Sequence, residues 1–341
     1  MADKTAAQGE LLFNRLTRRY RHLQKWARRT GTNAYRLYDR DIPEIPLVLD
    51  LYADAVVGAL YKRPYEKDES EEKAWLGVMK ASCSRALDIP ENRIYLKERQ
   101  RMRDRQESGN QYGRISIQSV YRDIRENDLV FRANLSDYLD TGLFLDGRKK
   151  RALIRSEAAG KRVLNLFAYT CSLSVAAAKG AARQVDSVDL SNTYLEWGRI
   201  NFALNGLESR CIDDDEYFRR PEHGCPALVR SDVMQFISQA TARKYRWDIV
   251  ILDPPSFSNS KSMRGTLDIR RDHPDLIRHC LSLLSPDGTL YFSSSAKGFR
   301  FNENDFPGYV FKDMEKDLID DDFIGKRIPV CFRFTARKTV L

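Results

Sequence analysis

Residues Lys161 to Asp189 limit the possible folds of this chain more than any other stretch. Val163 to Phe167 is a short apolar run typical of a buried parallel strand, and a loop of small and polar residues follows it. Leu173 to Lys179 has a helix-forming composition, with Gly180 where a helix C-terminal cap is expected. Val185 to Val188 then predicts a second strand that ends in Asp189. This strand-loop-helix-strand unit indicates the α/β class.

The loop after the first strand lacks the GxGxxG pattern with which dinucleotide-binding folds approach a pyrophosphate. Phe167, Tyr169 and Cys171 would crowd such a ligand, which also disfavours a nicotinamide-dependent dehydrogenase. In an open parallel sheet, an acid about 20 residues past the first loop can accept two ribose hydroxyls. Asp189 occupies that position. We therefore expect a nucleoside ligand without phosphates, and S-adenosylmethionine has this chemistry.

Two further acids follow predicted strands. Ala227 to Val229 leads into Asp232, and Trp247 to Leu252 leads into Asp253, which Pro254 and a second proline follow. A single acid at a strand end is often only a helix N-cap. Three in series would form a row of acceptors along one sheet edge, suited to the ribose, the adenine amino group and the site of methyl transfer in turn.

Several motifs make the segment from Asp137 to Arg337 similar to a known family. They are DYLDTGLFLDGR at 137–148, NLFAYT at 165–170, DLSNTYLEW at 189–197, DPPSFSNSK at 253–261, RDH at 271–273 and KGFRF at 297–301. The segment resembles the guanine-N7 methyltransferase half (RlmK-type) of the bifunctional bacterial 23S ribosomal RNA methyltransferases. It resembles the RlmI-type ribosomal cytosine-C5 methyltransferases more distantly. The resemblance implies a Rossmann-like, seven-stranded S-adenosylmethionine-dependent methyltransferase domain, in which Val330 to Thr335 forms an antiparallel edge strand.

The strand-end acids and the resemblance together suggest a set of site residues. Asp253 and Pro254 are the predicted catalytic residues. The predicted cofactor-binding residues are Asp146, Arg148, Asn165, Phe167, Ala168, Tyr169, Thr170, Asp189, Leu190, Asp232 and Asp253. Only the resemblance brings Asp146 and Arg148 near the methionine end of the cofactor, because an Asp-Gly-Arg sequence by itself predicts a turn with a solvated arginine. Cys171 departs from the family, which usually has glycine after the threonine, and its side chain could narrow the cofactor pocket.

The chemistry of the acceptor separates the reactions that this family carries out. Methylation of cytosine C5 needs a cysteine thiolate, and the related cytosine enzymes place it where this chain has Ser293-Ser294-Ser295. Guanine N7 has an in-plane lone pair and no proton to lose, so alignment and stabilisation of the cationic product suffice. We therefore expect direct in-line transfer to guanine N7 without a covalent intermediate. An exocyclic amine, guanine N2 or adenine N6, could use the same Asp-Pro-Pro turn, although the RDH and KGFRF motifs favour N7.

The chain has 341 residues, which is too long for one average domain. We expect disorder or a linker at residues 1–10, a basic amphipathic helix within 11–42, a small α+β domain at 43–136 and the methyltransferase domain at 137–341. Leu11 to Arg40 contains nine basic residues against one acid, with apolar residues at helical spacing. The predicted elements of the small domain are a hairpin (Leu47–Tyr52, Val56–Tyr61), a helix (Glu71–Leu87), a strand (Arg93–Glu98) and a second hairpin (Val120–Ile124, Leu129–Ala133).

The net charge of +9 and its placement favour a polyanionic partner. Basic residues at every second position from Lys97 to Arg105 would line one face of an extended segment. We predict contacts to 23S ribosomal RNA or its large-subunit precursor from Arg15, Arg18, Arg19, Lys25, Arg28, Arg99, Arg101, Arg103, Lys297 and Arg300. A basic helix could instead lie on a membrane, but its apolar stripe is narrow.

Further features narrow the functional classes. The chain shows no long apolar run and no signal peptide, which favours a cytoplasmic protein without membrane contact. Its six cysteines form no CxxC pair, and Cys211, His223 and Cys225 lack a fourth ligand, so no metal is expected. A second methyltransferase domain could be fused or act alongside at the N-terminal side. The alternative outside enzymology is an RNA-binding ribosome-assembly factor with a degenerate fold, which the three strand-end acids disfavour.

Overall fold

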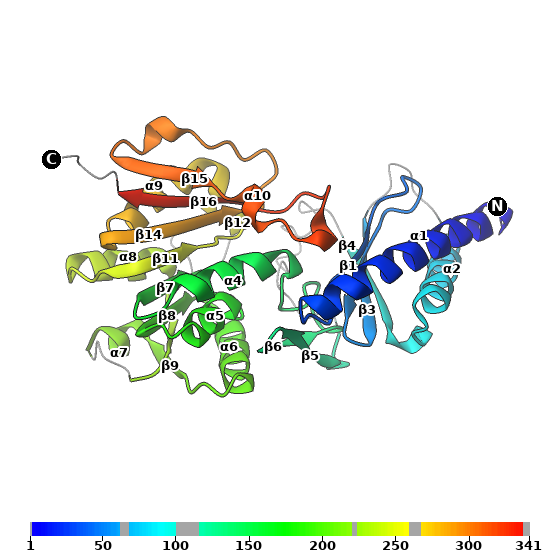
Figure 1. Ribbon diagram of the computed structural model, residues 1–341, viewed down its shortest axis with the longest axis horizontal. Coiled ribbons are helices and arrows are strands. Elements are labelled where there is room, and N and C mark those ends of the chain that lie inside the picture. The colour runs from blue at the N-terminus through cyan, green and yellow to red at the C-terminus, as the bar shows by residue number, and fades with distance from the viewer. Residues whose placement is uncertain (1, 62–67, 100–115, 220–223, 259–266, 337–341) are drawn as a thin grey trace. The chain divides into compact units, whose positions relative to one another are not determined.

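The computed structural model describes residues 2–61, 68–99, 116–219, 224–258 and 267–336 (Figure 1). The chain forms two compact units. The first comprises Met1–Leu145 and Asp321–Lys326, and the second comprises Asp146–Asp320 and Arg327–Leu341. The first unit therefore extends past residue 136, where we expected it to end, and it includes a short segment from near the end of the chain.

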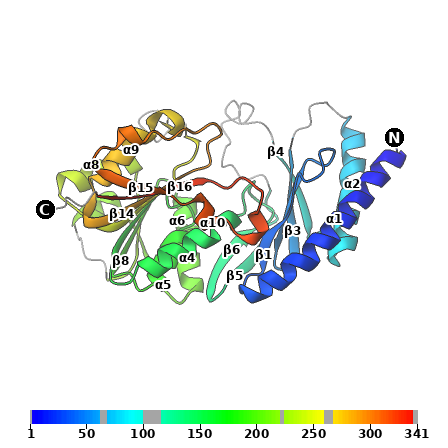
Figure 2. The ribbon, with the colours of Figure 1, turned by 45° about the horizontal axis from the view of Figure 1, so that its top comes forward.

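The first unit is a four-stranded sheet with two helices against one face (Figure 2). The helices are α1 (Ala2–Arg29) and α2 (Glu69–Leu87). The strands, in sheet order, are β1 (Ala34–Asp39), β2 (Leu47–Tyr52), β3 (Ala55–Tyr61) and β4 (Ile94–Arg99). A separate hairpin of β5 (Tyr121–Glu126) and β6 (Leu129–Asn134) follows. Both predicted hairpins, the helix and the strand are thus confirmed within one or two residues of their expected bounds.

Helix α1 differs from its prediction at both ends. It begins at Ala2, whereas we expected disorder up to residue 10, because its first turns pack on α2: Trp75 Nε1 donates to Gln8 Oε1 at 2.7 Å. It ends at Arg29, whereas we expected helical structure within 11–42. Gly31 has a φ of +64°, which stops the helix, and the largely buried residues of β1 follow.

The second unit is built on a mixed sheet with helices on both faces (Figure 2). Among the described residues this sheet has eight strands. In sheet order they are β15 (Tyr309–Asp313), β16 (Val330–Ala336), β14 (Leu284–Ser294), β11 (Trp247–Leu252), β7 (Arg162–Leu166), β8 (Gln184–Asp189), β10 (Ala227–Arg230) and β9 (Arg210–Asp213). Helices α4 (Arg148–Glu157) and α5 (Ser172–Lys179) cover one face, and α8 (Val233–Ala242) and α9 (Ile269–Leu281) cover the other (Figure 2).

The other α-helices and strands of this unit are α6 (Asn192–Leu204), α7 (Asp214–Arg219), α10 (Glu315–Leu318) and the paired β12 (Phe257–Ser258) and β13 (Leu267–Asp268). Helix α6 packs on β8, β9 and β10. The core between the sheet and helices α8 and α9 includes Leu164, Val250 and Phe236, which are not exposed to solvent. This packing places the carboxyl ends of the parallel strands along one edge of the sheet.

Two features of the sheet differ from the sequence-based expectation. The last strand, β16, is antiparallel as predicted but is not the edge, because β15 pairs with it on the other side. Phe301 stacks on Phe332 with ring centroids 4.3 Å apart, so the segment before β15 has its own apolar anchor. β9 adds a strand at the opposite edge, and α7, which contains the buried Tyr217, follows it.

Candidate active site

The carboxyl ends of four parallel strands lie side by side in the order β11, β7, β8 and β10. Asp253 directly follows β11, the loop 167–171 follows β7, Asp189 ends β8, and Asp232 lies two residues after β10. All three predicted acids therefore lie along the same sheet edge, with the β7 loop between Asp253 and Asp189. This is the edge at which open α/β sheets bind ligands.

The β7 loop has an unusual backbone. Phe167, Tyr169 and Cys171 adopt left-handed conformations, with φ values of 56°, 50° and 60°. Such conformations are costly for residues with side chains and persist only where the surroundings hold them. Here the Tyr169 backbone N–H donates to Asp189 Oδ2 at 2.9 Å, and the Ala168 N–H donates to the Val188 carbonyl at 3.0 Å. The strand that ends in Asp189 thus shapes the loop beside it.

Asp189 is half-buried and holds two backbone segments together. Its Oδ1 accepts a hydrogen bond from the Ser191 N–H at 2.9 Å, while Oδ2 accepts from Tyr169. Burial raises the pKa of Asp189, and its backbone hydrogen bonds from Ser191 and Tyr169 offset that shift only in part. Each carboxylate oxygen has a second lone pair. Asp189 can therefore accept two further O–H donors, as a ribose diol would supply.

Asp232 is the N-cap of α8. Its Oδ1 accepts from the backbone N–H groups of Met234 at 2.9 Å and Gln235 at 3.0 Å. No residue in the described part of the chain donates a hydrogen bond to its Oδ2. Asp232 is therefore a helix cap through Oδ1, and its Oδ2 stays available to accept a hydrogen bond from an amino group.

Asn165 and Thr170 do not present their side chains at this edge. Both residues are 1% exposed. Asn165 Nδ2 donates to Ser174 Oγ at 2.9 Å, which ties β7 to α5, and the carbonyl of Thr170 accepts from Asn201 Nδ2 at 2.8 Å. These contacts support the loop from behind. Phe167, Tyr169 and Leu190 are half-buried and remain near the edge with the buried Ala168.

Arg148 is not the solvated arginine that its turn sequence predicts. It follows a 3-10 turn at Leu145–Gly147 and begins α4, where it is 8% exposed. Arg148 Nη1 donates to Asp320 Oδ2 at 2.8 Å, and the neighbouring Lys149 Nζ donates to the carbonyl of Ile319 at 2.6 Å. Both contacts tie the start of α4 to the segment after α10. Asp146 lies in the same turn and is half-buried.

Lys150 is a site residue that the sequence alone did not reveal to us. Its Nζ donates to Asp253 Oδ2 at 2.6 Å and to Ser293 Oγ at 2.8 Å. Burial opposes the ammonium form, but the charge and hydrogen bond of Asp253 prevail and raise the pKa of Lys150. The sequence signal that distinguishes Lys150 within the run Arg148 to Arg151 is its spacing from Ile154. Ile154 is fully buried and lies four residues later, on the same face of the helix.

Ser293 and Cys331 lie beside this ion pair. They are directly paired across β14 and β16. Cys331 is 2% exposed, and burial raises the pKa of its thiol although the nearby Lys150 opposes that shift. A buried thiol with a raised pKa is inert at neutral pH. The resemblance to the cytosine enzymes implies that a nucleophilic cysteine would lie at 293–295, where this chain has serines. The structure adds Cys331 as the neighbour of Ser293 on the adjacent strand.

The RDH and KGFRF motifs meet on the α9 side of the sheet. The ring of His273 lies 4.7 Å from that of Phe299, edge to face, and its Nδ1 lies 3.0 Å from the carbonyl of Ile269. His273 is buried, which lowers its pKa, so it is neutral at pH 7. Lys297 and Arg300 in the same segment are exposed.

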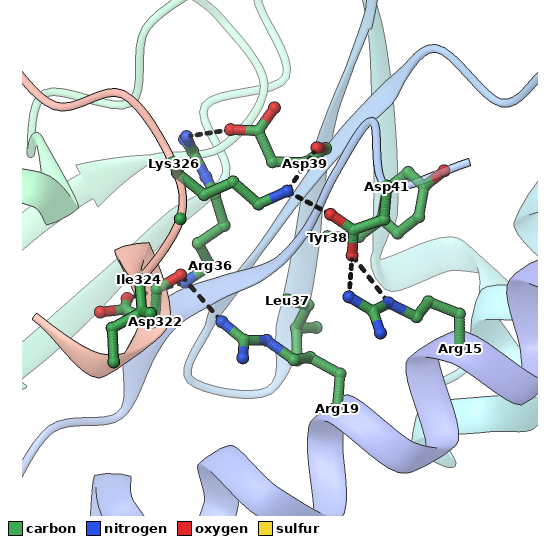
Figure 3. Close-up of a pocket in the computed structure, with 11 residues that line it drawn as sticks. Arg15, Arg19, Arg36, Leu37, Tyr38, Asp39, Asp41, Asp322, Ile324 and Lys326 are labelled. Atoms are coloured by element: carbon green, nitrogen blue, oxygen red, sulfur yellow. Dashed lines mark hydrogen bonds and ion pairs between the residues drawn. The ribbon is translucent and has the colours of Figure 1, made fainter. Parts of the chain in front are cut away.

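The predicted RNA-binding residues of α1 divide into two groups. Figure 3 shows Arg15 and Arg19 directed toward β1 and the segment 321–326. Arg15 pairs with Asp41 at 2.7 Å, and Arg19 Nη2 donates to the carbonyls of Asp321 and Asp322 at 3.4 and 3.1 Å. Arg18, Lys25 and Arg28 are exposed.

The β4 part of the predicted basic stripe is different. Lys97 is 8% exposed, and its Nζ donates to the carbonyl of Tyr138 at 2.6 Å, so it does not contribute to a basic surface. The side chain of Arg99, and Arg101 and Arg103 entirely, lie outside the described residues. Within the described ranges, no helix is long and apolar enough to cross a membrane, and no group of His, Cys, Asp or Glu could hold a metal ion.

Comparison with known proteins gives consistent matches. Residues 48–301 match the model of a family described as S-adenosylmethionine-dependent methyltransferase. Ribosomal RNA large subunit methyltransferase K of Neisseria meningitidis serogroup B is 40% identical over 319 residues, which cover 94% of this chain and 85% of that protein. Ribosomal RNA large subunit methyltransferase K/L of Pseudomonas fluorescens is 40% identical over 330 residues, 96% of this chain but 41% of that protein. The chain thus spans about two fifths of the K/L relative's length.

Solved structures show the same fold. The methyltransferase-like protein SMU.776, crystallised with SAH, superposes with a TM-score of 0.72 at 23% identity, covering 96% of this chain and 82% of that one. A SAM-dependent methyltransferase-like protein from Streptococcus mutans superposes with a TM-score of 0.71 at 24% identity, covering 96% and 81%. At these identities the likeness concerns the fold alone.

Proposed function

This chain belongs to the S-adenosylmethionine-dependent methyltransferases, and we propose that it transfers a methyl group to guanine N7 of 23S ribosomal RNA. The observation that carries the proposal is the shared sheet edge, where Asp189 and the β7 loop lie next to the Asp253 carboxylate. The relatives named for large-subunit ribosomal RNA support the substrate class.

The residues at this edge fit S-adenosylmethionine, which supplies a methyl group on a cationic sulfonium. Asp189 has the two open lone pairs that a ribose diol needs, and Asp232 Oδ2 is available to the adenine amino group. The strained β7 loop lies between these acids and Asp253 and could pass beside the nucleoside. Its side chains leave no glycine-lined cradle for a pyrophosphate, consistent with a ligand that has no phosphate.

Asp253 and the rigid proline turn after it are proposed to meet the acceptor base. The Asp253 side chain is 37% exposed, and Pro254 behind it is buried. Guanine becomes cationic as N7 is methylated, and a carboxylate at that position would stabilise the developing charge. The raised pKa of Lys150 keeps its ammonium protonated, so the lysine is unsuited to act as a base. An acceptor without a proton to lose suits this arrangement.

Cysteine-dependent methylation of a carbon atom is disfavoured. That chemistry needs a thiolate poised to attack the base. Cys331 is the cysteine paired with Ser293, but it is buried and its thiol has a raised pKa. The direct, in-line displacement that we propose involves no covalent bond between the enzyme and the base.

An exocyclic amine is the second candidate acceptor. Nothing in the described part of the chain donates a hydrogen bond to Asp253 Oδ1. This oxygen could accept an N–H from the amino group of guanine N2 or adenine N6. Guanine N7 itself has no N–H to donate. The open Oδ1 of Asp253 is therefore the observation that favours an exocyclic amine as the second candidate.

The outward face of α1 is proposed to contact the RNA backbone. Arg18, Lys25 and Arg28 lie within about 80° of one another around an ideal helix, on the side opposite the buried Leu16 and Leu23. Exposed Lys297 and Arg300 would contribute from the second unit. Because the K/L relative is much longer than its match to this chain, a second methyltransferase domain acting alongside remains part of the proposal, as does a cytoplasmic location.

The test is methylation of unmodified 23S ribosomal RNA by the purified protein with labelled S-adenosylmethionine, followed by nucleoside mass spectrometry. A 7-methylguanosine product that disappears in Asp253→Ala would support both the reaction and the site. Methyl on guanine N2 or on adenine would overturn the target atom. If the wild-type protein does not bind S-adenosylmethionine, the result favours the alternative of a non-catalytic assembly factor.

A further inference from the structure

We infer that Lys150 is a positioning residue that holds the Asp253 carboxylate in its working orientation through an ion pair supported by Ser293. This inference rests on the proposed role of Asp253 in methyl transfer. Three elements meet at the lysine: α4 provides the ammonium, the end of β11 provides the carboxylate, and β14 provides the hydroxyl. Lys150 lies 103 residues from Asp253 in the sequence and 143 from Ser293.

The burial of the pair is asymmetric. The Lys150 side chain is 10% exposed, whereas that of Asp253 is 37% exposed. Burying an ammonium costs free energy, and a buried ion pair seldom recovers that cost. Apolar residues of the same volume would often give an equally stable protein. The buried partner therefore supports the exposed one.

The geometry fixes one carboxylate oxygen and leaves the other open. Lys150 donates its hydrogen bond to Oδ2, while Oδ1 receives no hydrogen bond from the described residues. Ser293 accepts from the same ammonium, so the lysine cannot turn away from Asp253 without breaking a second hydrogen bond. A carboxylate held by one oxygen presents the other in a constant direction, which is what alignment of an acceptor base requires.

Lys150 also provides the counter-charge of Asp253. The titratable groups that face the lysine are Asp253 after β11, Cys331 on β16 and Asp146 before α4. Cys331 is neutral because burial raises its pKa, so Asp253 and Asp146 provide the negative charge. Replacing the ammonium with an apolar group would leave Asp253 without this counter-charge and without the hydrogen bond to Oδ2.

The experiment compares Lys150→Met with Lys150→Arg, Asp253→Asn and the double variant Lys150→Met/Asp253→Asn. Lys149→Met is the matched control, since Lys149 precedes Lys150 in α4 but bonds the carbonyl of Ile319. The readouts are transfer of labelled methyl to 23S ribosomal RNA, cofactor affinity by calorimetry and thermal unfolding. Methyl transfer is counted whichever atom accepts it.

Lys150→Met should lower kcat about 100-fold and change cofactor affinity less than about threefold. Lys149→Met should keep the wild-type kcat. Lys150→Arg should recover part of the lost rate, because it restores a positive charge beside Asp253. In the Asp253→Asn background, loss of the lysine should have little additional effect, because the lysine acts through that carboxylate.

Additive losses in the double variant, or a Lys150→Met kcat equal to that of the wild type, would overturn the inference and leave Lys150 as a structural residue. An active wild-type protein that methylates another atom would overturn the guanine-N7 proposal and leave the role of Lys150 intact. Cofactor binding without any methyl transfer by the wild-type protein would overturn both. If Lys150→Met fails to fold, Lys150→Arg and its double variant with Asp253→Asn decide the same question.

Discussion

The thiol of Cys171 occupies the space that a side chain on Gly198 would need. A Cβ built on Gly198 in α6 would lie 2.6 Å from Cys171 Sγ and 3.0 Å from its Cβ. Cys171 is fully buried, so its side chain is packed against α6. The departure from the family's glycine in the β7 loop is therefore accommodated by a glycine on the neighbouring helix. The expected narrowing of the cofactor pocket by this side chain remains a prediction, which this packing disfavours.

Gly198→Ala should lower the free energy of unfolding by about 1–3 kcal/mol, because the added methyl overlaps a buried side chain. Cys171→Gly in the same chain should recover most of that loss, since it removes the overlap and suits the left-handed backbone at position 171. Urea unfolding of the wild type, the two single variants and the double variant measures the coupling between positions 171 and 198. Gly77→Ala in α2, where a Cβ meets nothing within 4 Å, is the control and should not destabilise. Equal losses at positions 77 and 198 would contradict the packing argument.

Asp189→Ala should weaken S-adenosylmethionine binding by about 2–4 kcal/mol, measured by calorimetry. The change removes the proposed ribose acceptor and also frees the Tyr169 backbone N–H that shapes the β7 loop. Unchanged affinity would exclude the ribose role. The loop contribution alone should appear as lower thermal stability of the free protein.

Asp232→Ala should cost about 1 kcal/mol of stability, because α8 loses its N-cap. Asp232→Ser should restore most of that stability, since serine is also a good cap. Calorimetry on both variants then tests the adenine contact. If the alanine and serine variants bind the cofactor like the wild type, Asp232 is a helix cap only.

Reversing Arg18, Lys25 and Arg28 to glutamate should weaken RNA binding and reduce the slope of log affinity against log salt by about one for each phosphate that the protein no longer neutralises. Cofactor binding should not change. Reversal of the exposed lysines at 73, 161 and 244 alters the net charge equally and controls for the long-range field. Arg19→Met should lower stability rather than RNA affinity, because its hydrogen bonds to the carbonyls of Asp321 and Asp322 disappear. Equal effects of both triple variants would show that α1 has no specific role.

Lys97→Met should alter the pH dependence of stability. Burial lowers the pKa of Lys97 to about 8, and the charges of Asp137 and Asp140 offset this only in part. Between about pH 8 and the ordinary lysine value near 10.4, the unfolded chain binds more protons, so wild-type stability should rise with pH. The stability of Lys97→Met relative to wild type should therefore decrease by up to about 3 kcal/mol from pH 7 to pH 11. Urea unfolding at both pH values, with Lys73→Met as an exposed control, measures this difference.

The sequence by itself predicted the central strand-loop-helix-strand unit and the acids at its strand ends. These features are local: a short apolar run, a cap residue and an acid at a fixed spacing determine where a strand ends. β7, α5 and β8 accordingly lie within one or two residues of their predicted bounds, and Asp189 ends its strand as expected. The small domain's hairpins were predictable for the same reason.

Only the tertiary structure decided which charged residues are free and which are bound. Arg15 and Arg18 are both exposed basic residues on one helix, but Arg15 pairs with Asp41, 26 residues away, whereas Arg18 has no ion-pair partner among the described residues. Lys150 lies in the basic run Arg148 to Arg151, and only the fold brings it to Asp253. Ion pairs, the β9 and β15 edge strands and the fit of Cys171 to Gly198 depend on contacts between distant segments. Local periodicity carries no information about such contacts, because their free energy exists only once the sheet has formed.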